Sequence, residues 1–316
     1  MRTDELDGPG HVPVLLTEAV DALALKPDAV ALDATVGLGG HSREILKRIP
    51  RGRLIALDQD ADALQRSAQV FQGDPRVTLR KTNFAGLLAT LEELAIDKVD
   101  AVLMDLGVSS LQLGTPARGF SFQHSGPLDM RMDPSGTPSA FDVVNRYDER
   151  ELKRILRDFG EEPKADRLAR RIVEARSRKP IETTQDLAAV VEGLYPSTGP
   201  NASRRHPATR LFQAIRLEVN RELEVLETGL KGAQTALRPG GRLAVITFHS
   251  LEDRIVKQFL ARESKGCLCP PKQPMCTCGH QPSFRLVQRK PLEPGEEELR
   301  NNPRSRSAKL RVAERL

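Results

Sequence analysis

The stretch that decides how this chain can fold is Asp33-Ala34-Thr35-Val36-Gly37-Leu38-Gly39-Gly40-His41. It follows the short apolar run Val30-Ala31-Leu32 and precedes Ser42-Arg43-Glu44-Ile45-Leu46, which is typical of the start of a helix. Glycines at a strand-to-helix turn let the backbone bend tightly and let a ligand approach it closely. An acid at the end of the strand can then contact a polar or cationic part of that ligand. Taken alone, the pattern also fits a tight turn that binds nothing.

The composition is that of a globular protein. A chain of 316 residues is enough for one large domain, or for a domain of roughly 200 residues and a smaller one. Hydrophobic residues make up 39% and charged residues 29%, which argues against a disordered chain. With no Trp and two Tyr, binding by rows of stacked aromatic rings is not expected. The net charge of +5 favours a polyanionic partner only mildly, because scattered solvated arginines would explain it as well.

Nothing in the sequence indicates export or insertion into a membrane. Residues 1–7 lack the basic start and apolar core of a secretory signal. There is no uninterrupted apolar run of the ~20 residues that span a bilayer. All four cysteines fall between Cys267 and Cys278, which argues against a general disulfide framework. We therefore expect a cytoplasmic protein without a membrane partner.

Apolar runs that alternate with amphipathic segments predict the architecture. Strands are expected at 30–33, 53–58, 77–81, 99–105 and 242–249, with helices at 17–25, 41–49, 60–71, a segment ending near 95, and 250–263. Residues 284–290 and 307–314 are expected to add a final hairpin. Regular alternation predicts βαβ units, and so an α/β doubly wound parallel sheet covered on both faces.

Ligands of such sheets bind beyond the carboxyl ends of the strands. Asp33, Asp58, Phe84 and Asp105 all lie at or just beyond predicted strand ends. This placement favours a ligand site over an empty turn.

The alternation breaks after residue 111. Residues 114–138 are rich in Gly, Pro and Ser, and apolar stripes then predict helices around 152–159, 165–173 and 187–194. A long helix is expected from Pro207, with one apolar stripe from Leu211 to Leu230. We therefore predict a first part of the sheet domain at 1–112, an all-helical insertion at 113–206, and a second part of the sheet domain at 207–316.

Two cofactor classes fit a glycine turn followed by an acid that ends the next strand. In both, Asp58 can accept hydrogen bonds from ribose hydroxyls, and its distance along the chain from the turn is close to the ~20 residues expected. Nicotinamide-binding folds seat a pyrophosphate on Gly-x-Gly-x-x-Gly, but Gly37-Leu38-Gly39-Gly40 has its third glycine in the wrong place. S-adenosylmethionine carries a sulfonium cation and an amino group, which suits Asp33. Because Pro239-Gly240-Gly241 before a strand is also typical of methyltransferases, the sequence favours S-adenosylmethionine.

Longer motifs resemble one family. They comprise residues 33–42, 57–60, 104–110, 119–122, 128–132, 205–210, 212–216 and 247–254. The family is MraW, also called RsmH, whose members methylate N4 of a cytidine in the decoding region of bacterial 16S ribosomal RNA. The resemblance covers nearly the whole chain. It implies a class I S-adenosylmethionine-dependent methyltransferase (Rossmann-like) fold, S-adenosylmethionine as the cofactor and the small ribosomal subunit as the partner.

The resemblance also implies which residues contact the cofactor, namely Gly39, Gly40, His41, Asp58, Phe84, Asp105 and Gln112. To these the reasoning on the turn adds Asp33 and Gly37. We expect residues 39–41 to lie near the methionine part of the cofactor, Asp58 at the ribose, and Phe84 and Asp105 beside the adenine. His41 could equally cap the following helix.

Methyl transfer to an exocyclic amine depends on in-line placement, and an acceptor for its N–H would help to localise the lone pair. Many amino-methylating enzymes carry Asp/Asn/Ser-Pro-Pro-Tyr/Phe after the fourth strand. This chain has Asp105-Leu106-Gly107-Val108 there, so that arrangement cannot be transferred. The catalytic candidates at the substrate end are Asp105, Ser109, Ser110 and His249, and Asp129, Arg131 and Ser250 are further candidates there.

A basic set on the insertion suggests a surface for RNA. It comprises Lys164, Arg167, Arg170, Arg171, Arg176, Arg178 and Lys179, joined by Arg204, Arg205 and Arg210. Such residues could neutralise phosphates, or they could form an ordinary solvated helix face. A target base must be unstacked to reach the cofactor, which suits single-stranded or loop RNA.

The cysteines suggest a metal site. Cys267, Cys269, Cys276 and Cys278, with His280 close by, could bind one structural zinc ion tetrahedrally. Cys-x-Cys spacing is less diagnostic than Cys-x-x-Cys, and the resemblance implies no metal. Reduced thiols or a locally oxidised pair are the alternatives.

The leading hypothesis is an S-adenosylmethionine-dependent RNA cytosine-N4 methyltransferase. A small-molecule or DNA methyltransferase is the alternative on the same fold, and a non-catalytic RNA-binding or assembly factor is the alternative from another class. An intact turn at 33–41 together with Asp58 argues against the last, because a scaffold needs neither. The sequence leaves the oligomeric state open, with a homodimer as one option.

Overall fold

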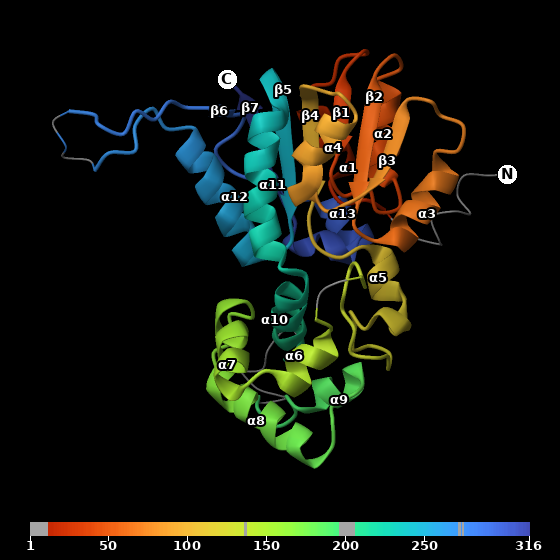
Figure 1. The fold of residues 1–316 in the computed structure, drawn as a ribbon, viewed down its shortest axis with the longest axis vertical. Coiled ribbons are helices and arrows are strands. Elements are labelled where there is room, and N and C mark those ends of the chain that lie inside the picture. The colour runs from red at the N-terminus through yellow and green to blue at the C-terminus, as the bar shows by residue number, and fades with distance from the viewer. Residues whose placement is uncertain (1–11, 136–137, 196–205, 271–272, 274) are drawn as a thin grey trace. The chain divides into compact units, whose positions relative to one another are not determined.

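The computed structural model describes residues 12–135, 138–195, 206–270, 273 and 275–316. It divides into two compact units. The sheet unit comprises Met1–Gly107 and Leu223–Leu316, and the helical unit comprises Val108–Glu222 (Figure 1).

The sheet unit is built on one seven-stranded sheet with the order β3-β2-β1-β4-β5-β7-β6. The strands are β1 (Val30–Asp33), β2 (Arg53–Asp58), β3 (Val77–Lys81), β4 (Val99–Asp105), β5 (Leu237–Thr247), β6 (Phe284–Leu286) and β7 (Lys309–Arg315). The first five in the sheet are parallel to one another, whereas β7 runs antiparallel to both β5 and β6. The predicted α/β doubly wound fold of a class I methyltransferase is confirmed, and the final hairpin is present.

Alternating side chains of the strands build a hydrophobic core on each face of this sheet. On β2, Leu54 and Ala56 belong to one core, while Ile55 and Leu57 belong to the other. This is the period of two that an extended chain imposes. The first core is covered by α1 (Leu16–Ala22), α2 (Gly40–Arg48) and α3 (Ala61–Val70). The second is covered by α4 (Leu87–Glu93), α11 (Glu222–Ala236) and α12 (Ser250–Glu263).

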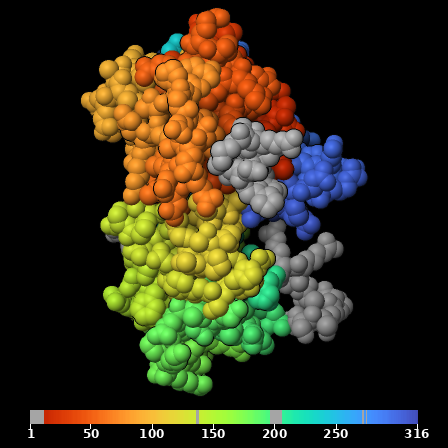
Figure 2. Space-filling view, turned by 90° about the vertical axis from the view of Figure 1, so that its right-hand side faces the viewer, coloured from red at the N-terminus to blue at the C-terminus, as the bar shows by residue number. Residues whose placement is uncertain are grey.

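The helical unit has a core of its own. Its helices are α5 (Ser110–Gly114), α6 (Ala140–Arg146), α7 (Glu149–Asp158), α8 (Ala165–Arg178), α9 (Thr184–Ala189) and α10 (Ala208–Asn220). Short 3-10 turns lie at Pro116–Arg118 here, and at Phe84–Gly86 and Pro303–Ser307 in the sheet unit, which also contains α13 (Glu296–Asn301). Leu152 and Ile155 of α7 pack with Leu168 and Ile172 of α8 in this core. The yellow and green residues form a closely packed body in Figure 2.

The long helix expected from Pro207 is wrong in one respect: it is two helices. Arg221 separates α10 from α11 in the left-handed region, with a φ of 49°. Leu211 and Ile215 of α10 pack in the helical core, whereas Leu226 and Leu230 of α11 pack against the sheet. A continuous apolar stripe therefore serves two different cores.

The unit boundaries differ from the predicted ones for the same reason. The structure divides the chain after Gly107 and after Glu222, whereas the sequence suggested divisions at 112/113 and 206/207. Packing assigns α5 and α10 to the helical unit. Across the described residues, no helix combines the length and the apolar character needed to cross a membrane.

Candidate active site

The turn after β1 is organised from inside by Asp33. This side chain is 1% exposed, and its Oδ2 accepts a 2.6 Å hydrogen bond from Ser42 Oγ. Its Oδ1 accepts one from the backbone N–H of Thr35 at 3.1 Å. Burial raises the pKa of Asp33 above its ordinary value, although the bond from Ser42 lowers it. Asp33, which the sequence suggested as a contact for the ligand, therefore stabilises the turn itself.

Two glycines of the turn are required by close packing. Gly39 has a φ of +82°, and a Cβ there would lie 2.8 Å from the ring of Phe71. A Cβ on Gly40 would lie 2.3 Å from Pro13 Cγ. Both distances are shorter than carbon atoms tolerate, so the tight path of this backbone depends on residues without a side chain.

Asp58, at the end of β2, ties this turn to the neighbouring strand. Its Oδ2 accepts a hydrogen bond from the N–H of Gly37 at 2.9 Å, and its Oδ1 accepts one from the N–H of Asp60, also at 2.9 Å. Burial raises its pKa to about 6, although these two N–H groups lower it. Each carboxylate oxygen has two lone pairs, so Asp58 can accept further hydrogen bonds from hydroxyl groups.

Asp105, at the end of β4, carries an unused acceptor. Its Oδ1 is buried and has no hydrogen-bond partner among the described residues. Its backbone N–H donates to Thr35 Oγ1 at 2.7 Å, which joins β4 to the turn after β1. Burial raises the pKa of Asp105 to about 6, although His41 lowers it. A buried polar atom of this kind normally has a partner, so Oδ1 is a natural contact for a ligand.

His41 lies between Asp105 and the N-terminal segment. Its Nε2 is 3.1 Å from the carbonyl oxygen of Val14, which can only accept, so Nε2 carries a proton. Its Nδ1 lies 3.6 Å from Asp105 Oδ2. His41 therefore connects the N-terminal segment to the end of β4.

Phe84 follows β3 and is held by its surroundings. Asn83 Oδ1 accepts from the N–H of Ala85 at 3.0 Å and so begins the 3-10 turn. A Cβ on Gly229 of α11 would lie 2.5 Å from the Phe84 ring, so the ring packs closely on that helix. The ring is half-buried, and its position depends on a glycine far along the chain.

His249 follows β5 and is fixed by an acid of α12. Its Nε2 lies 3.0 Å from Glu252 Oε1. Glu252 is 2% exposed, and its Oε2 accepts from the N–H of Phe248 at 2.9 Å. Glu252 therefore caps α12 through the backbone N–H groups of Phe248 and His249, whereas both ring nitrogens of His249 are buried and have no hydrogen-bond partner among the described residues.

Within the sheet unit, the predicted residues thus come from the carboxyl ends of consecutive strands in the sheet, β3, β2, β1, β4 and β5. The carboxylates of Asp58 and Asp105 can accept hydrogen bonds from hydroxyl and N–H groups of a ligand. This chemistry fits the ribose hydroxyls and the adenine amino group of S-adenosylmethionine.

Other candidates belong to the helical unit. Ser109 caps α5: its Oγ accepts from the N–H of Gln112 at 3.2 Å, and Gln112 Oε1 accepts from the N–H of Ser109 at 3.0 Å. Gln112 is 4% exposed, and Ser110 follows as the first residue of the helix. Asp129 and Arg131 form a pair within one loop, with Arg131 Nη2 2.7 Å from Asp129 Oδ2.

The basic set of the insertion has two kinds of member. Arg171 donates to the carbonyl of Glu192, and Arg176 donates to the carbonyls of Val144 and Tyr147. Those two therefore hold the helical unit together. Exposed members of the set are Arg167, Arg170, Arg178, Lys179 and Arg210, whereas Arg204 and Arg205 lie outside the described residues.

Sequence reasoning missed the residues that support the site. Thr35 links β1 to β4, Ser42 holds Asp33, and Ser67 Oγ donates to the carbonyl of Gly37 at 2.7 Å. Thr35 and Ser42 lie inside the motif at 33–42, but the partner of Thr35 is set by the pairing of β1 with β4, which no local pattern reports. The four cysteines are together, with their sulfur atoms all within 4.8 Å of one another.

Comparisons with known proteins agree with this picture. A model of the MraW methylase family matches residues 9–316. The chain is 52% identical to a ribosomal RNA small subunit methyltransferase H of Carboxydothermus hydrogenoformans, over 97% of this chain and 98% of that protein. It is 50% identical to the protein of the same name from Symbiobacterium thermophilum, over 97% and 96%. An rRNA methylase structure from Streptococcus thermophilus is remote, with a TM-score of 0.42 and 12% identity over 97% and 99%.

Proposed function

The chain belongs to the MraW methylase family, and we propose that it transfers a methyl group from S-adenosylmethionine to N4 of a cytidine in the decoding region of 16S ribosomal RNA. The relatives at about 50% identity are named as methyltransferases of small-subunit ribosomal RNA. That name supports the substrate class, and the motifs described above support the choice of the cytosine amine.

The observation that carries the proposal is the carboxylate pair at the ends of β2 and β4. Asp105 Oδ1 is buried without a partner among the described residues, and both oxygens of Asp58 keep acceptor capacity. The ribose hydroxyls of the cofactor would satisfy Asp58, and an N–H group of its adenine would satisfy Asp105 Oδ1.

Each residue of the turn then has a role. Bound S-adenosylmethionine supplies a methyl group that its sulfonium makes electrophilic. Asp58 accepts hydrogen bonds from the ribose hydroxyls, and Phe84 and Asp105 flank the adenine. The backbone of residues 37–41 lines the methionine part of the cofactor, and Asp33 keeps that backbone in position.

The acceptor amine must lose a proton as its nitrogen gains the methyl group. Asp105 and His249 are the two titratable groups among our four catalytic candidates. Burial raises the pKa of Asp105 to about 6, so its carboxylate can accept this proton near neutral pH, and the imidazole of His249 is the second candidate base. Ser109 and Ser110 contribute hydroxyl groups that can accept from the amine N–H, and Gln112 contacts the cofactor.

The helical unit binds the RNA in this proposal. Its exposed cations Arg167, Arg170, Arg178 and Lys179 neutralise phosphates, while Arg171 and Arg176 keep the helices packed. The target cytidine is unstacked on binding. The enzyme acts in the cytoplasm on the small ribosomal subunit, as a monomer or as a homodimer.

The test supplies labelled cofactor together with small ribosomal subunits, naked 16S RNA, DNA or protein. Label in 16S RNA supports the proposal. Label in DNA alone indicates a DNA methyltransferase. Cofactor binding without any transfer indicates an assembly factor that kept the fold. Asp58→Ala should abolish whichever transfer the wild-type protein shows. Asp62→Ala serves as the control, because Asp62 is an exposed acid on α3.

A further inference from the structure

The segment at 264–283 connects α12 to β6 and has almost no core of its own. It leads away from α12 as an extended path (Figure 1). None of its described residues is buried, and Met275 is 78% exposed. Its base is anchored by Ser283, whose N–H donates to the carbonyl of Glu263 at 2.8 Å. A connection of this length without regular structure is uncommon unless something holds it, because ordering each residue costs conformational entropy.

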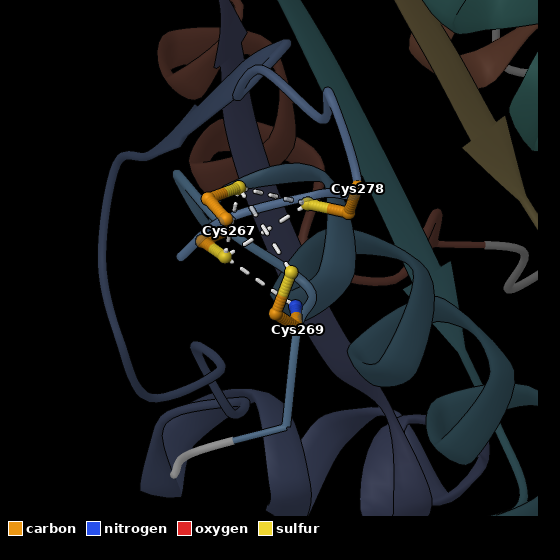
Figure 3. Close-up of side chains that lie close together, drawn as sticks. Cys267, Cys269 and Cys278 are labelled. Carbon is orange, nitrogen blue, oxygen red and sulfur yellow. Dashed lines mark hydrogen bonds between the residues drawn. The ribbon is translucent and has the colours of Figure 1, made fainter. Parts of the chain in front are cut away.

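Four cysteine sulfur atoms meet in the middle of this segment. Cys276 Sγ lies 3.4 Å from Cys267 Sγ, 3.9 Å from Cys269 Sγ and 3.5 Å from Cys278 Sγ. Figure 3 shows the sulfur atoms of Cys267, Cys269 and Cys278 pointing toward one another. One sulfur atom with three near neighbours indicates convergence on a common centre, whereas disulfides would join the thiols in pairs.

These separations match one particular centre. A zinc ion holds four thiolates tetrahedrally at about 2.3 Å, which places the sulfur atoms about 3.8 Å apart. An iron–sulfur cluster distributes its cysteines over separate iron atoms, so its ligands lie further apart than the 4.8 Å limit of this group. His280 is not part of the group, and its Nε2 lies 3.2 Å from the carbonyl oxygen of Arg262.

The backbone also prepares the sulfur atoms for negative charge. The N–H of Leu268 donates to Cys278 Sγ, that of Cys269 to Cys267 Sγ, and that of Thr277 to Cys269 Sγ, each at 3.4 Å. Hydrogen bonds from N–H groups to ligating sulfur atoms orient them and stabilise the thiolate form. Four thiolates so close together would repel one another strongly without a cation between them.

We propose that Cys267, Cys269, Cys276 and Cys278 bind one structural zinc ion that folds the segment between α12 and β6. The site has four protein ligands and no open position, so it has no catalytic role. The four ligands come as two Cys-x-Cys pairs, and Ser283 holds the base of the segment. The proposal is independent of the methyl-transfer function, because none of the four sulfur atoms belongs to the candidate active site.

The test uses the full chain, purified without chelator and analysed for metals. We expect about one zinc per chain in the wild-type protein, and a zinc content at least about tenfold lower in Cys276→Ser. The matched control is Met275→Ser, which alters the exposed neighbour of Cys276 and keeps all four thiols. Zinc below about a tenth of an equivalent in wild-type protein after reconstitution with zinc sulfate would overturn the proposal. So would stoichiometric iron in place of zinc, or equal zinc contents in the two variants.

A second measurement needs no variant and so does not depend on how a mutant folds. Wild-type protein reconstituted with Co²⁺ should show the intense visible bands of a tetrahedral ion and strong thiolate-to-cobalt absorption in the near ultraviolet. Titration of the thiols with a mercurial reagent should then release the cobalt in proportion to the cysteines modified. A weak octahedral spectrum, or cobalt that stays bound after all four thiols are modified, would contradict the assignment.

Discussion

The backbone N–H of Gly37 donates to the carboxylate of Asp58 across 2.9 Å, and so ties the glycine turn after β1 to the end of β2. The contact makes the ribose-binding candidate a structural element of the turn as well. A substitution at either residue is therefore expected to disturb both the turn after β1 and the end of β2.

Asp58→Ala should weaken the binding of S-adenosylmethionine by about tenfold or more, because it removes the acceptors for the ribose hydroxyls and for Gly37. Isothermal titration calorimetry measures the dissociation constant. Asp62→Ala should change it little. An unchanged affinity in Asp58→Ala would remove this residue from the cofactor site.

Cofactor affinity should rise as the pH increases through about 6. Burial raises the pKa values of Asp58 and Asp105 to about 6, and each accepts hydrogen bonds from the ribose hydroxyls or the adenine most strongly when it is ionised. Binding below that pH should release protons, which calorimetry in buffers of different ionisation enthalpy detects. An affinity independent of pH between about 5 and 7 would argue against contact between the cofactor and these carboxylates.

The stability of the unliganded protein, in contrast to the cofactor affinity, should fall as the pH rises through about 6. A carboxyl group whose pKa is raised from 3.8 to about 6 binds more protons in the folded state than in the unfolded state between those values. Its contribution is fully present below about pH 4 and is lost as the pH rises through about 6. Asp105→Asn should remove its share of this loss, on the order of 1–3 kcal/mol. Urea unfolding at a series of pH values would show it, and parallel curves for variant and wild type would contradict it.

Gly39→Ala should destabilise the fold by about 1–3 kcal/mol, because its Cβ would strike the Phe71 ring. Gly73→Ala is the control, since Gly73 has a similar φ of +81° but nothing within 4 Å of its Cβ. The free energy of unfolding of the control should fall by only about 1 kcal/mol, the cost of placing an alanine at this positive φ. Equal losses of unfolding free energy in denaturant titrations would show that the packing against Phe71 contributes nothing.

Substitution of the exposed arginines should affect RNA binding, whereas substitution of the arginines that donate to backbone carbonyls should affect stability. Arg167→Ala with Arg178→Ala should weaken RNA binding and reduce the salt slope by about 1–2, with little change in stability. Arg176→Ala should instead lower the melting temperature, because the carbonyls of Val144 and Tyr147 lose their donor. Filter binding at several salt concentrations and thermal unfolding distinguish the two. Identical behaviour would mean that this division of the basic set is wrong.

The fold was largely predictable, because strand period and turn residues are local signals. A continuous apolar run predicts a strand that is buried on both faces, and Leu54, Ile55, Ala56 and Leu57 indeed alternate between two cores. The division at Arg221 was not predictable. The apolar stripe continues across it, and only packing shows that α10 and α11 serve different cores.

Candidate residues for the site could be selected from the sequence, but their contacts could not. Strand ends identified Asp33, Asp58 and Asp105, whereas the inward role of Asp33 depends on Ser42 and the link from Asp105 to Thr35 depends on strand pairing. The cysteine cluster shows the same limit. Spacing suggested a metal, but the convergence of four sulfur atoms required three dimensions.

The most direct test of the central claim is mass-spectrometric nucleoside analysis of 16S ribosomal RNA after incubation of small subunits with the enzyme and methyl-labelled S-adenosylmethionine. The account predicts label in N4-methylcytidine at a decoding-region position with wild-type enzyme, and none with Asp58→Ala. Label on any other nucleoside, or none in the RNA while the enzyme binds the cofactor, would contradict it.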